Sequence, residues 1–300
     1  MKKTVAFTAC DINNLKYAKL LIKSFQYFHP EIDFVLFTND KSEKLEGVRR
    51  LDISGDIAMQ KDLFYKQKPY FADKLFKEGY EAVLGLDSDM LVLGKLDYIF
   101  KHEDYDIGSV LNFNPLDFRT YGPITFSPIH YATEYQNAGL VMMRSHKLVQ
   151  HWLKLCNDKF FNRMPYKEQD LMNIIIHFGE YTHKCFDDAD PLENYYAWHG
   201  LLATHSGLKM KMVGDDVILP KSEDGYPSQD VKVKVWHPAG GQANTDKLNY
   251  RIAFSEEVIN RINEILQEVD VKKWYKEQAS VKIRRMTPAE IAQRNKNKNE

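Results

Sequence analysis

Ala82-Val-Leu-Gly-Leu-Asp-Ser-Asp89 joins a strand pattern to two closely spaced carboxylates, and it indicates the fold more strongly than any other segment. Its first five residues form an apolar run typical of a buried strand, and two carboxylates follow directly after that run. In open α/β sheets, ligands bind beyond the carboxyl ends of the strands. Asp87 and Asp89 are therefore expected beside a binding site.

The segments before this stretch indicate how the sheet is built. Apolar runs at residues 4–8 and 34–38 predict two more strands, and amphipathic patterns predict helices at 15–28 and at about 70–77. Alternation of short strands with helices is typical of parallel strands joined by crossover helices. The fold class predicted from the pattern is α/β.

The middle of the chain is less regular. Residues 112–135 are rich in proline, aromatic residues and threonine, and predict a long ordered loop or lid. Residues 137–143 predict a turn of small residues followed by a strand. Further patterns predict helices at 148–161 and 168–177 and a half-buried strand at 231–236.

Composition excludes several classes of protein. With 300 residues, 44% hydrophobic and 28% charged, the chain can bury a core of its own. The net charge of −1 gives no reason to expect nucleic acid or an anionic membrane as a general partner. Cys10, Cys156 and Cys185 form no CxxC pair, which argues against disulfide frameworks and cysteine-rich zinc sites.

The sequence has no signal-peptide core and no run of about 18 apolar residues, so the expected location is the cytoplasm. We expect a catalytic domain over residues 1–254 and a helical extension over 255–300. Ser255 is a suitable N-cap for that helix, and Val258, Ile262, Ile265 and Val269 mark one apolar face.

The end of the chain is basic. Residues 272–300 contain nine Lys or Arg and three Glu, with Trp274 and Tyr275 near the start. One interpretation is a solvated helix with an unstructured end. Two others are a basic-aromatic surface that rests on anionic lipid at a membrane, or a dimerisation helix.

Asp87 and Asp89 can reach one hard cation together, because they lie one residue apart at a strand end. Mg²⁺ and Mn²⁺ prefer oxygen ligands and are commonly shared with substrate phosphates. His237 follows a predicted strand and could complete the site, while Gly240 lets the backbone approach phosphate oxygens. Against this, Asp-x-Asp triplets occur in many turns, and most lone histidines are structural.

Two other motifs carry suitable polar groups. Asn137-Ala-Gly139 places an amide beside small residues, where sugar hydroxyls could approach, although an ordinary turn has the same composition. Glu168-Gln169-Asp170 opens a predicted helix, where acidic residues often complement the helix dipole. The functional alternative is that these side chains face the reacting carbon of a sugar.

Taken together and in this order, the motifs resemble those of glycosyltransferase family 8, which contains glycogenin and bacterial galactosyl- and glucosyltransferases. The resemblance covers roughly residues 4 to 245. It rests on Phe-Thr-Ala-Cys-Asp, Leu-Asp-Ser-Asp-Met-Leu-Val, Asn-Ala-Gly-Leu, Glu-Gln-Asp-Leu-Met-Asn and His-Pro-Ala-Gly. The ordered set is more specific than any one motif.

The resemblance implies a GT-A fold, a Rossmann-like mixed sheet flanked by helices. It also implies a retaining hexosyltransferase that uses Mn²⁺ (or Mg²⁺) and a UDP-sugar, with glucose or galactose as the sugar. Asp87, Asp89 and His237 would bind the metal. The residues implied to contact the donor are Thr8, Ala9 and Cys10 at the nucleoside, Tyr17 on the base, Lys74 near the diphosphate or sugar, Ser88, Asn137, Ala138 and Gly240. Gln169, Glu168 and Asp89 would be the catalytic residues, with Gln169 on the reacting face.

Two positions depart from the family's pattern. Glu168 stands where the family usually has Asp, which affects sugar preference. A base at Glu168 that activates the acceptor would instead make the reaction inverting. After the His-x-x-Gly motif the usual Lys-Pro-Trp run is replaced by Gln242-Ala-Asn-Thr, so Lys247 is the substitute for a phosphate contact.

Two other functions remain open on the sequence. A metal-dependent phosphoryl-transfer or hydrolytic enzyme could use the same carboxylates, but the chain has no P-loop. A non-catalytic nucleotide-sugar or carbohydrate-binding protein is the other alternative. The acceptor is expected to be a glycan, lipid-linked or protein hydroxyl. Acceptor contacts are expected in residues 112–135 and 186–230, including Tyr195, Tyr196 and Trp198.

Overall fold

The computed structural model describes twelve segments of the chain, and all structural statements below concern these residues. They are 3–12, 14–39, 45–55, 66–111, 135–159, 164, 166–186, 193–194, 197–198, 209–221, 229–237 and 254–266. Several predicted features lie outside them: the loop or lid at 112–134, Gly240, Lys247, Tyr195 and Tyr196, and the tail from 267 onward.

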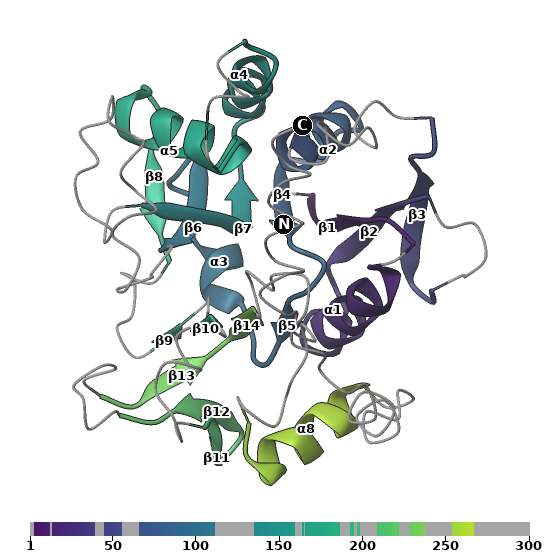
Figure 1. Ribbon diagram of the computed structural model, residues 1–300, viewed down its shortest axis with the longest axis vertical. Coiled ribbons are helices and arrows are strands. Elements are labelled where there is room, and N and C mark those ends of the chain that lie inside the picture. Colours follow the sequence, from purple (N-terminus) through teal and green to yellow (C-terminus); the bar gives the residue numbers. More distant parts are fainter. Residues whose placement is uncertain are drawn as a thin grey trace, which may run out of the picture.

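A seven-stranded mixed sheet forms the centre of the described structure (Figure 1). Its order is β3 (Val48–Asp52), β2 (Asp33–Thr38), β1 (Thr4–Cys10), β4 (Ala82–Leu86), β7 (Gln136–Met143), β6 (Ile107–Leu111) and β8 (His183–Cys185). The first four strands are parallel to one another. Strand β7 runs antiparallel between β4 and β6. The predicted α/β class is confirmed, and the antiparallel strand makes the sheet mixed.

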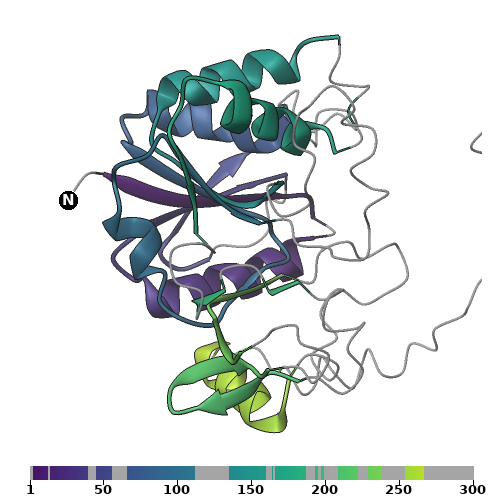
Figure 2. The ribbon, with the colours of Figure 1, turned by 90° about the vertical axis from the view of Figure 1, so that its left-hand side faces the viewer.

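Helices cover both faces of this sheet (Figure 2). One face carries α2 (Gln67–Lys77), α4 (His146–Cys156) and α5 (Glu168–Phe178), and the other carries α1 (Leu15–Phe28) and α3 (Asp97–Lys101). Strand β1 shows why both faces are buried. Its side chains alternate between the two faces, so Phe7 packs under α2 and α5 while Ala6 packs under α1.

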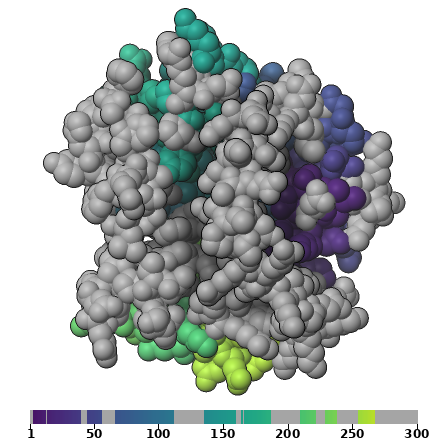
Figure 3. Space-filling model, viewed as in Figure 1, coloured from purple at the N-terminus to yellow at the C-terminus, as the bar shows by residue number. Residues whose placement is uncertain are grey.

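Two small sheets and a last helix lie beyond α1. The order β10 (Ala197–Trp198), β14 (Val235–His237), β5 (Leu91–Val92) makes one sheet. The other has the order β11 (Lys211–Val213), β12 (Asp216–Leu219), β13 (Val231–Val233), β9 (Glu193–Asn194). Helix α8 (Glu256–Leu266) lies beside the β11–β12 hairpin at the bottom of the face in Figure 3.

A third core cluster joins these outer elements to the main sheet's helix layer. It contains Tyr17 and Leu20 of α1, Trp236 of β14, and Val258 and Ile262 of α8. Val258, Ile262 and Ile265 of the predicted apolar face are therefore buried, while Val269 lies outside the described residues. Ser255 accepts a hydrogen bond from the Val258 N–H at 3.4 Å, as expected of its N-cap. No helix among the described residues has both the length and the apolarity to cross a membrane.

Several expected boundaries need correction. Residues 137–143 were expected to begin as a turn, but β7 is a strand throughout, because its amides pair with β4 and β6 on both sides. The single strand expected at 231–236 is two short strands that pair in different sheets. The helix expected at 148–161 is α4 (His146–Cys156), which begins at the N-cap Ser145.

Candidate metal and donor site

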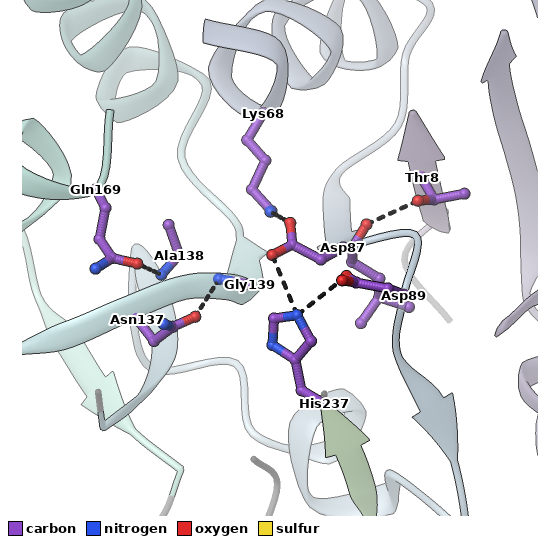
Figure 4. Close-up of polar contacts among 10 residues, drawn as sticks. Thr8, Lys68, Asp87, Asp89, Asn137, Ala138, Gly139, Gln169 and His237 are labelled. Carbon is purple, nitrogen blue, oxygen red and sulfur yellow. Dashed lines mark hydrogen bonds and ion pairs between the residues drawn. The ribbon is translucent and has the colours of Figure 1, made fainter. Parts of the chain in front are cut away.

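Asp87 is placed by the backbone of three central strands. Its N–H donates to the Gly139 carbonyl at 2.8 Å, which continues the pairing of β4 with β7. One residue earlier, the Leu86 carbonyl accepts a hydrogen bond from the Thr8 hydroxyl at 2.9 Å. The end of β4 is thus held by β1 on one side and by β7 on the other, and the Asp87 carboxylate projects beyond it (Figure 4).

His237 comes to the same point from the small sheet. Strand β14 runs antiparallel to β5, with Val235 opposite Val92 and Trp236 opposite Leu91. Continuing that register brings His237 toward the turn that contains Asp89. The two residues are 148 positions apart in the sequence, and His237 Nε2 lies 3.1 Å from Asp89 Oδ1.

Asp87, Asp89 and His237 form a group that could hold a metal ion. Each offers one ligand atom, and these atoms all lie within 4.8 Å of one another. His237 Nε2 lies 3.6 Å from Asp87 Oδ2. Asp89 and His237 are only 8% and 3% exposed. Two carboxylates and one imidazole, held together where water is scarce, suit Mn²⁺ or Mg²⁺ and so fit the expected ion.

Lys68 is the residue of this site that the sequence patterns missed. It lies in the first turn of α2, and its ammonium group is in direct contact with Asp87 Oδ1 (Figure 4). The residue is 4% exposed, an unusual burial for a lysine. A signal for it exists in the sequence, because Lys68 occupies the apolar stripe of α2 together with Phe71 and Leu75.

Gly139 lets three parts of the site come together. A Cβ at this position would lie 2.7 Å from Asn137 Oδ1, 2.8 Å from Met90 Cε and 3.1 Å from His237 Cε1. The Asn137 side chain accepts a hydrogen bond from the Gly139 N–H at 2.6 Å. The small-residue motif is therefore required by close packing around the candidate metal ligands, within a strand rather than a turn.

The first turn of α5 faces this strand. Gln169 Oε1 accepts a hydrogen bond from the Ala138 N–H at 2.9 Å (Figure 4), which joins two of the predicted motifs directly. Glu168 Oε2 is buried, with no hydrogen-bond partner in the described part of the chain. Burial raises the pKa of Glu168 to about 8, while the charge of Lys68 acts in the opposite direction. Glu168 is therefore mostly protonated at neutral pH.

Buried hydrogen bonds hold α5 against β7. The Asn173 side chain accepts from the Gln136 N–H at 2.7 Å and donates to the Gln136 carbonyl at 2.8 Å. Asp170 accepts from the Tyr135 hydroxyl and, at 2.8 Å, from the Tyr166 N–H. Lys167, between Tyr166 and the helix, has a φ of 53°, which is uncommon for a residue with a side chain. Asp170, which the sequence offered as a side chain facing a sugar or complementing the helix dipole, is bonded to Tyr135 and Tyr166. The sequence assigned no role to Asn173.

The contacts that the other predicted residues make with a donor stay predictions, and the structure places these residues as follows. Thr8, Ala9 and Cys10 are buried, so their expected contact with a nucleoside stays a prediction. Tyr17, expected to stack on a base, belongs to the third core cluster and is 9% exposed, a packing position. Lys74, expected near the diphosphate, places its ammonium over the Tyr70 ring at 4.8 Å, and Lys68 is the lysine of this helix that reaches Asp87. Ser88 is partly exposed between the two aspartates.

Comparison with known proteins gives a match by structure. No family model matches the sequence, and no curated protein sequence matches it. The galactosyltransferase LgtC, solved with donor and acceptor sugar analogues, is 17% identical with a TM-score of 0.55, and the match covers 88% of this chain and 96% of LgtC. An active-site mutant of LgtC matches similarly, with 17% identity and a TM-score of 0.55 over 87% of this chain and 95% of the other.

The bifunctional glycosyltransferase WbbM is 15% identical, with a TM-score of 0.57. The match covers 93% of this chain but only 52% of WbbM, so this chain spans about half of that protein. These matches agree with the mixed seven-stranded sheet flanked by helices. The chain therefore has the GT-A fold of these glycosyltransferases.

Proposed function

We propose that this protein is a metal-dependent glycosyltransferase of family 8. It transfers a hexose, glucose or galactose, from a UDP-sugar to a hydroxyl group of a glycan, lipid-linked or protein acceptor, with retention of configuration. The observation that carries the proposal is the group formed by Asp87, Asp89 and His237 at the carboxyl end of the central strands. The GT-A fold supports it, because the solved proteins that share the fold are glycosyltransferases.

The proposed roles follow from the contacts. Asp87, Asp89 and His237 would hold a divalent cation, which neutralises the charge that develops on a nucleoside diphosphate as it leaves. Gln169 is fixed by Ala138 beside this group, so its amide can lie against the donor sugar. Asn137 is held by Gly139 and would line the same pocket. Glu168, with a protonated carboxyl, can donate a hydrogen bond to a sugar oxygen.

Donor cleavage tests this proposal. The full-length protein is incubated with Mn²⁺ and a panel of UDP-, GDP-, CDP- and TDP-sugars, and the released nucleotide is measured. We expect release of UDP from UDP-glucose or UDP-galactose, abolished by EDTA and reduced at least about a hundredfold in Asp89→Asn. Asp97→Asn, which removes a carboxylate exposed on α3, is the matched control and should release UDP at the wild-type rate.

Each other outcome points to another class of protein. Release of inorganic phosphate instead of a nucleoside diphosphate would indicate a phosphoryl-transfer or hydrolytic enzyme. Metal-dependent nucleotide binding without release from any donor would indicate a non-catalytic binding protein. With an active donor in hand, the anomeric configuration of the product, followed by NMR, decides between retention and inversion. An inverted product would make Glu168 the candidate base.

A further inference from the structure

Lys68 occupies an unusual place for a lysine, beside a group of metal ligands. Its ammonium group contacts Asp87 Oδ1, while Asp87 Oδ2 faces His237 Nε2 at 3.6 Å. The two oxygens of the Asp87 carboxylate therefore face different partners. Oδ1 faces the Lys68 ammonium, and Oδ2 faces His237.

We propose that Lys68 is a built-in counter-ion of the metal site, and that it makes metal binding depend on the anionic donor. While the ammonium neutralises Asp87, a divalent cation alone binds weakly, because it enters against a fixed positive charge. When a nucleoside diphosphate binds, its negative charge interacts favourably with both Lys68 and the metal ion. The metal ion and the nucleoside diphosphate therefore strengthen each other's binding. This coupling rests on the function proposed above, whereas the weak binding of metal alone does not.

The burial of Lys68 keeps its charge at the site. Its side chain is only 5% exposed, whereas that of Asp87 is 32% exposed. Lys68 lies on the buried stripe of α2 with Phe71 and Leu75, and its ammonium is in contact with Asp87 rather than with water. Surface lysines have no such restriction, since their long side chains exchange freely between partners.

Removing Lys68 also has an effect on metal affinity in the opposite direction. Removing Lys68 also removes a hydrogen bond from Asp87, which could misplace that ligand and weaken metal binding. The backbone opposes such misplacement, because the Asp87 N–H is bonded to Gly139 and the preceding carbonyl is bonded to Thr8. We therefore expect the loss of positive charge to outweigh the loss of the contact.

The test is calorimetric titration of the full-length protein with Mn²⁺, first alone and then with saturating UDP. Lys68→Met keeps the length of the stem and removes the charge. It should bind Mn²⁺ alone about tenfold more tightly than the wild type, the effect of one nearby unit charge on a divalent ion. The factor by which UDP tightens Mn²⁺ binding should fall about tenfold in the same variant.

Two variants serve as controls. Lys68→Arg keeps the charge and should resemble the wild type in both titrations. Lys77→Met removes a lysine of the same helix that pairs with Asp73 at 2.6 Å, and should also leave both titrations unchanged. Circular dichroism of each variant establishes that it is folded, and Lys68→Gln repeats the test if Lys68→Met is not.

The inference is overturned if the folded Lys68 variants bind Mn²⁺ alone as weakly as the wild type or more weakly, or if the effect of UDP is unchanged. Absence of Mn²⁺ binding in every form also overturns it. Failure of the proposed function gives a different result: Lys68→Met still tightens Mn²⁺ binding, but no donor is cleaved.

Discussion

At the scale of single residues, the site brings like charges together. Asp87 and Asp89 face His237, whose Nε2 lies 3.6 Å from Asp87 Oδ2 and 3.1 Å from Asp89 Oδ1. Two carboxylates this close repel each other unless a cation lies between or beside them. Lys68 supplies one positive charge on the side of Asp87. A divalent ion would supply the rest, so its binding should stabilise the folded protein.

The first prediction at this scale concerns the close packing around Gly139. In Gly139→Ala the new methyl group would lie 2.7 Å from Asn137 Oδ1, 2.8 Å from Met90 Cε and 3.1 Å from His237 Cε1, so the first two side chains have to shift and the imidazole has to give by a few tenths of an ångström. We expect Mn²⁺ affinity to fall at least about tenfold and the free energy of unfolding to fall by about 1–3 kcal/mol. Calorimetry and urea unfolding measure the two quantities.

Gly94→Ala is the matched control. A Cβ at Gly94 approaches Lys234 Cδ at 3.1 Å, a flexible side chain that can give way. This variant should retain wild-type Mn²⁺ affinity. Equal metal affinity in Gly139→Ala and Gly94→Ala would show that His237 is not held by the packing around Gly139.

The second prediction concerns Glu168 and the dependence of the free energy of unfolding on pH. The folded state raises the pKa of Glu168 from 4.5 to about 8, so between these values the folded state holds a proton that the unfolded state has lost. The free energy of unfolding therefore falls as pH rises from about 4.5 to 8. Glu168→Gln removes this dependence, and at pH 8.5 it should be more stable than the wild type by about 1 kcal/mol or more.

The measurement is urea unfolding from pH 5 to 8.5 in metal-free buffer. Glu264→Gln, which removes an exposed carboxylate of α8, should give no such pH-dependent gain. A gain in Glu168→Gln that is equal at all pH values, or absent, would contradict the buried, protonated carboxyl.

At the scale of elements, helix α5 and strand β7 act as one unit. Asn173 bonds both backbone groups of Gln136, as a neighbouring strand would, and Gln169 bonds Ala138 two residues further on. The strained backbone at Lys167 is held by the bond from Tyr166 to Asp170. The position of Gln169 against Ala138, beside the proposed donor site, is therefore set by contacts that run along the helix.

Asn173→Ala tests this unit. The substitution leaves the N–H and carbonyl of Gln136 without their side-chain partner, in a buried position. We expect a loss of about 2–4 kcal/mol in the free energy of unfolding. Asn157→Ala removes an exposed contact to Lys66 and should cost less than about 0.5 kcal/mol. Urea unfolding compares them, and similar losses would mean that Asn173 does not join α5 to β7.

Elements with strong patterns were predictable, and those defined by distant pairing were not. Strand β4 and helix α1 match the predicted residues because an apolar run and a helical period each fix one element locally. Strands β3 (Val48–Asp52) and β6 (Ile107–Leu111) were missed. β3 carries two arginines on an edge of the sheet, and β6 contains a glycine that Phe186 packs against. Neither shows a regular alternation.

The residues of the candidate site also divide into those that local sequence places and those that depend on distant contacts. Asp87 and Asp89 follow from the end of one strand, so the sequence was sufficient to place them. The proximity of His237 depends on the pairing of β14 with β5, and that of Lys68 on the packing of α2, both of which are long-range. The motif resemblance indicated His237, whereas Lys68 required the structure.

At the scale of the whole molecule, α8 completes the third core cluster, which lies outside the main sheet. The boundary expected at residue 254 falls within this packing, since Phe254 packs on Trp236 with ring centroids 4.9 Å apart. Phe254 also forms an isolated bridge with Met210. We therefore expect helix α8 to unfold together with the site, through the strand that carries His237, while the division expected at residue 254 stays a prediction.

Ile262→Ala tests that connection. Ile262 is 1% exposed in the third core cluster, and truncating it should cost about 2–4 kcal/mol of unfolding free energy. Ile259→Ala, at a partly buried position of the same helix, should cost less. A single unfolding transition, followed by fluorescence and by circular dichroism, should shift as a whole in both. A separate early transition in Ile262→Ala would instead show that α8 unfolds independently.

The proposed function requires that Asp87, Asp89 and His237 together bind a divalent cation with the nucleotide of the donor. Crystals of the protein grown with Mn²⁺ and UDP, measured at the manganese absorption edge, test this requirement. We expect one strong anomalous peak bonded to all three side chains and to the diphosphate, absent in crystals of Asp89→Asn. A peak elsewhere, or a peak that persists in Asp89→Asn, would contradict it.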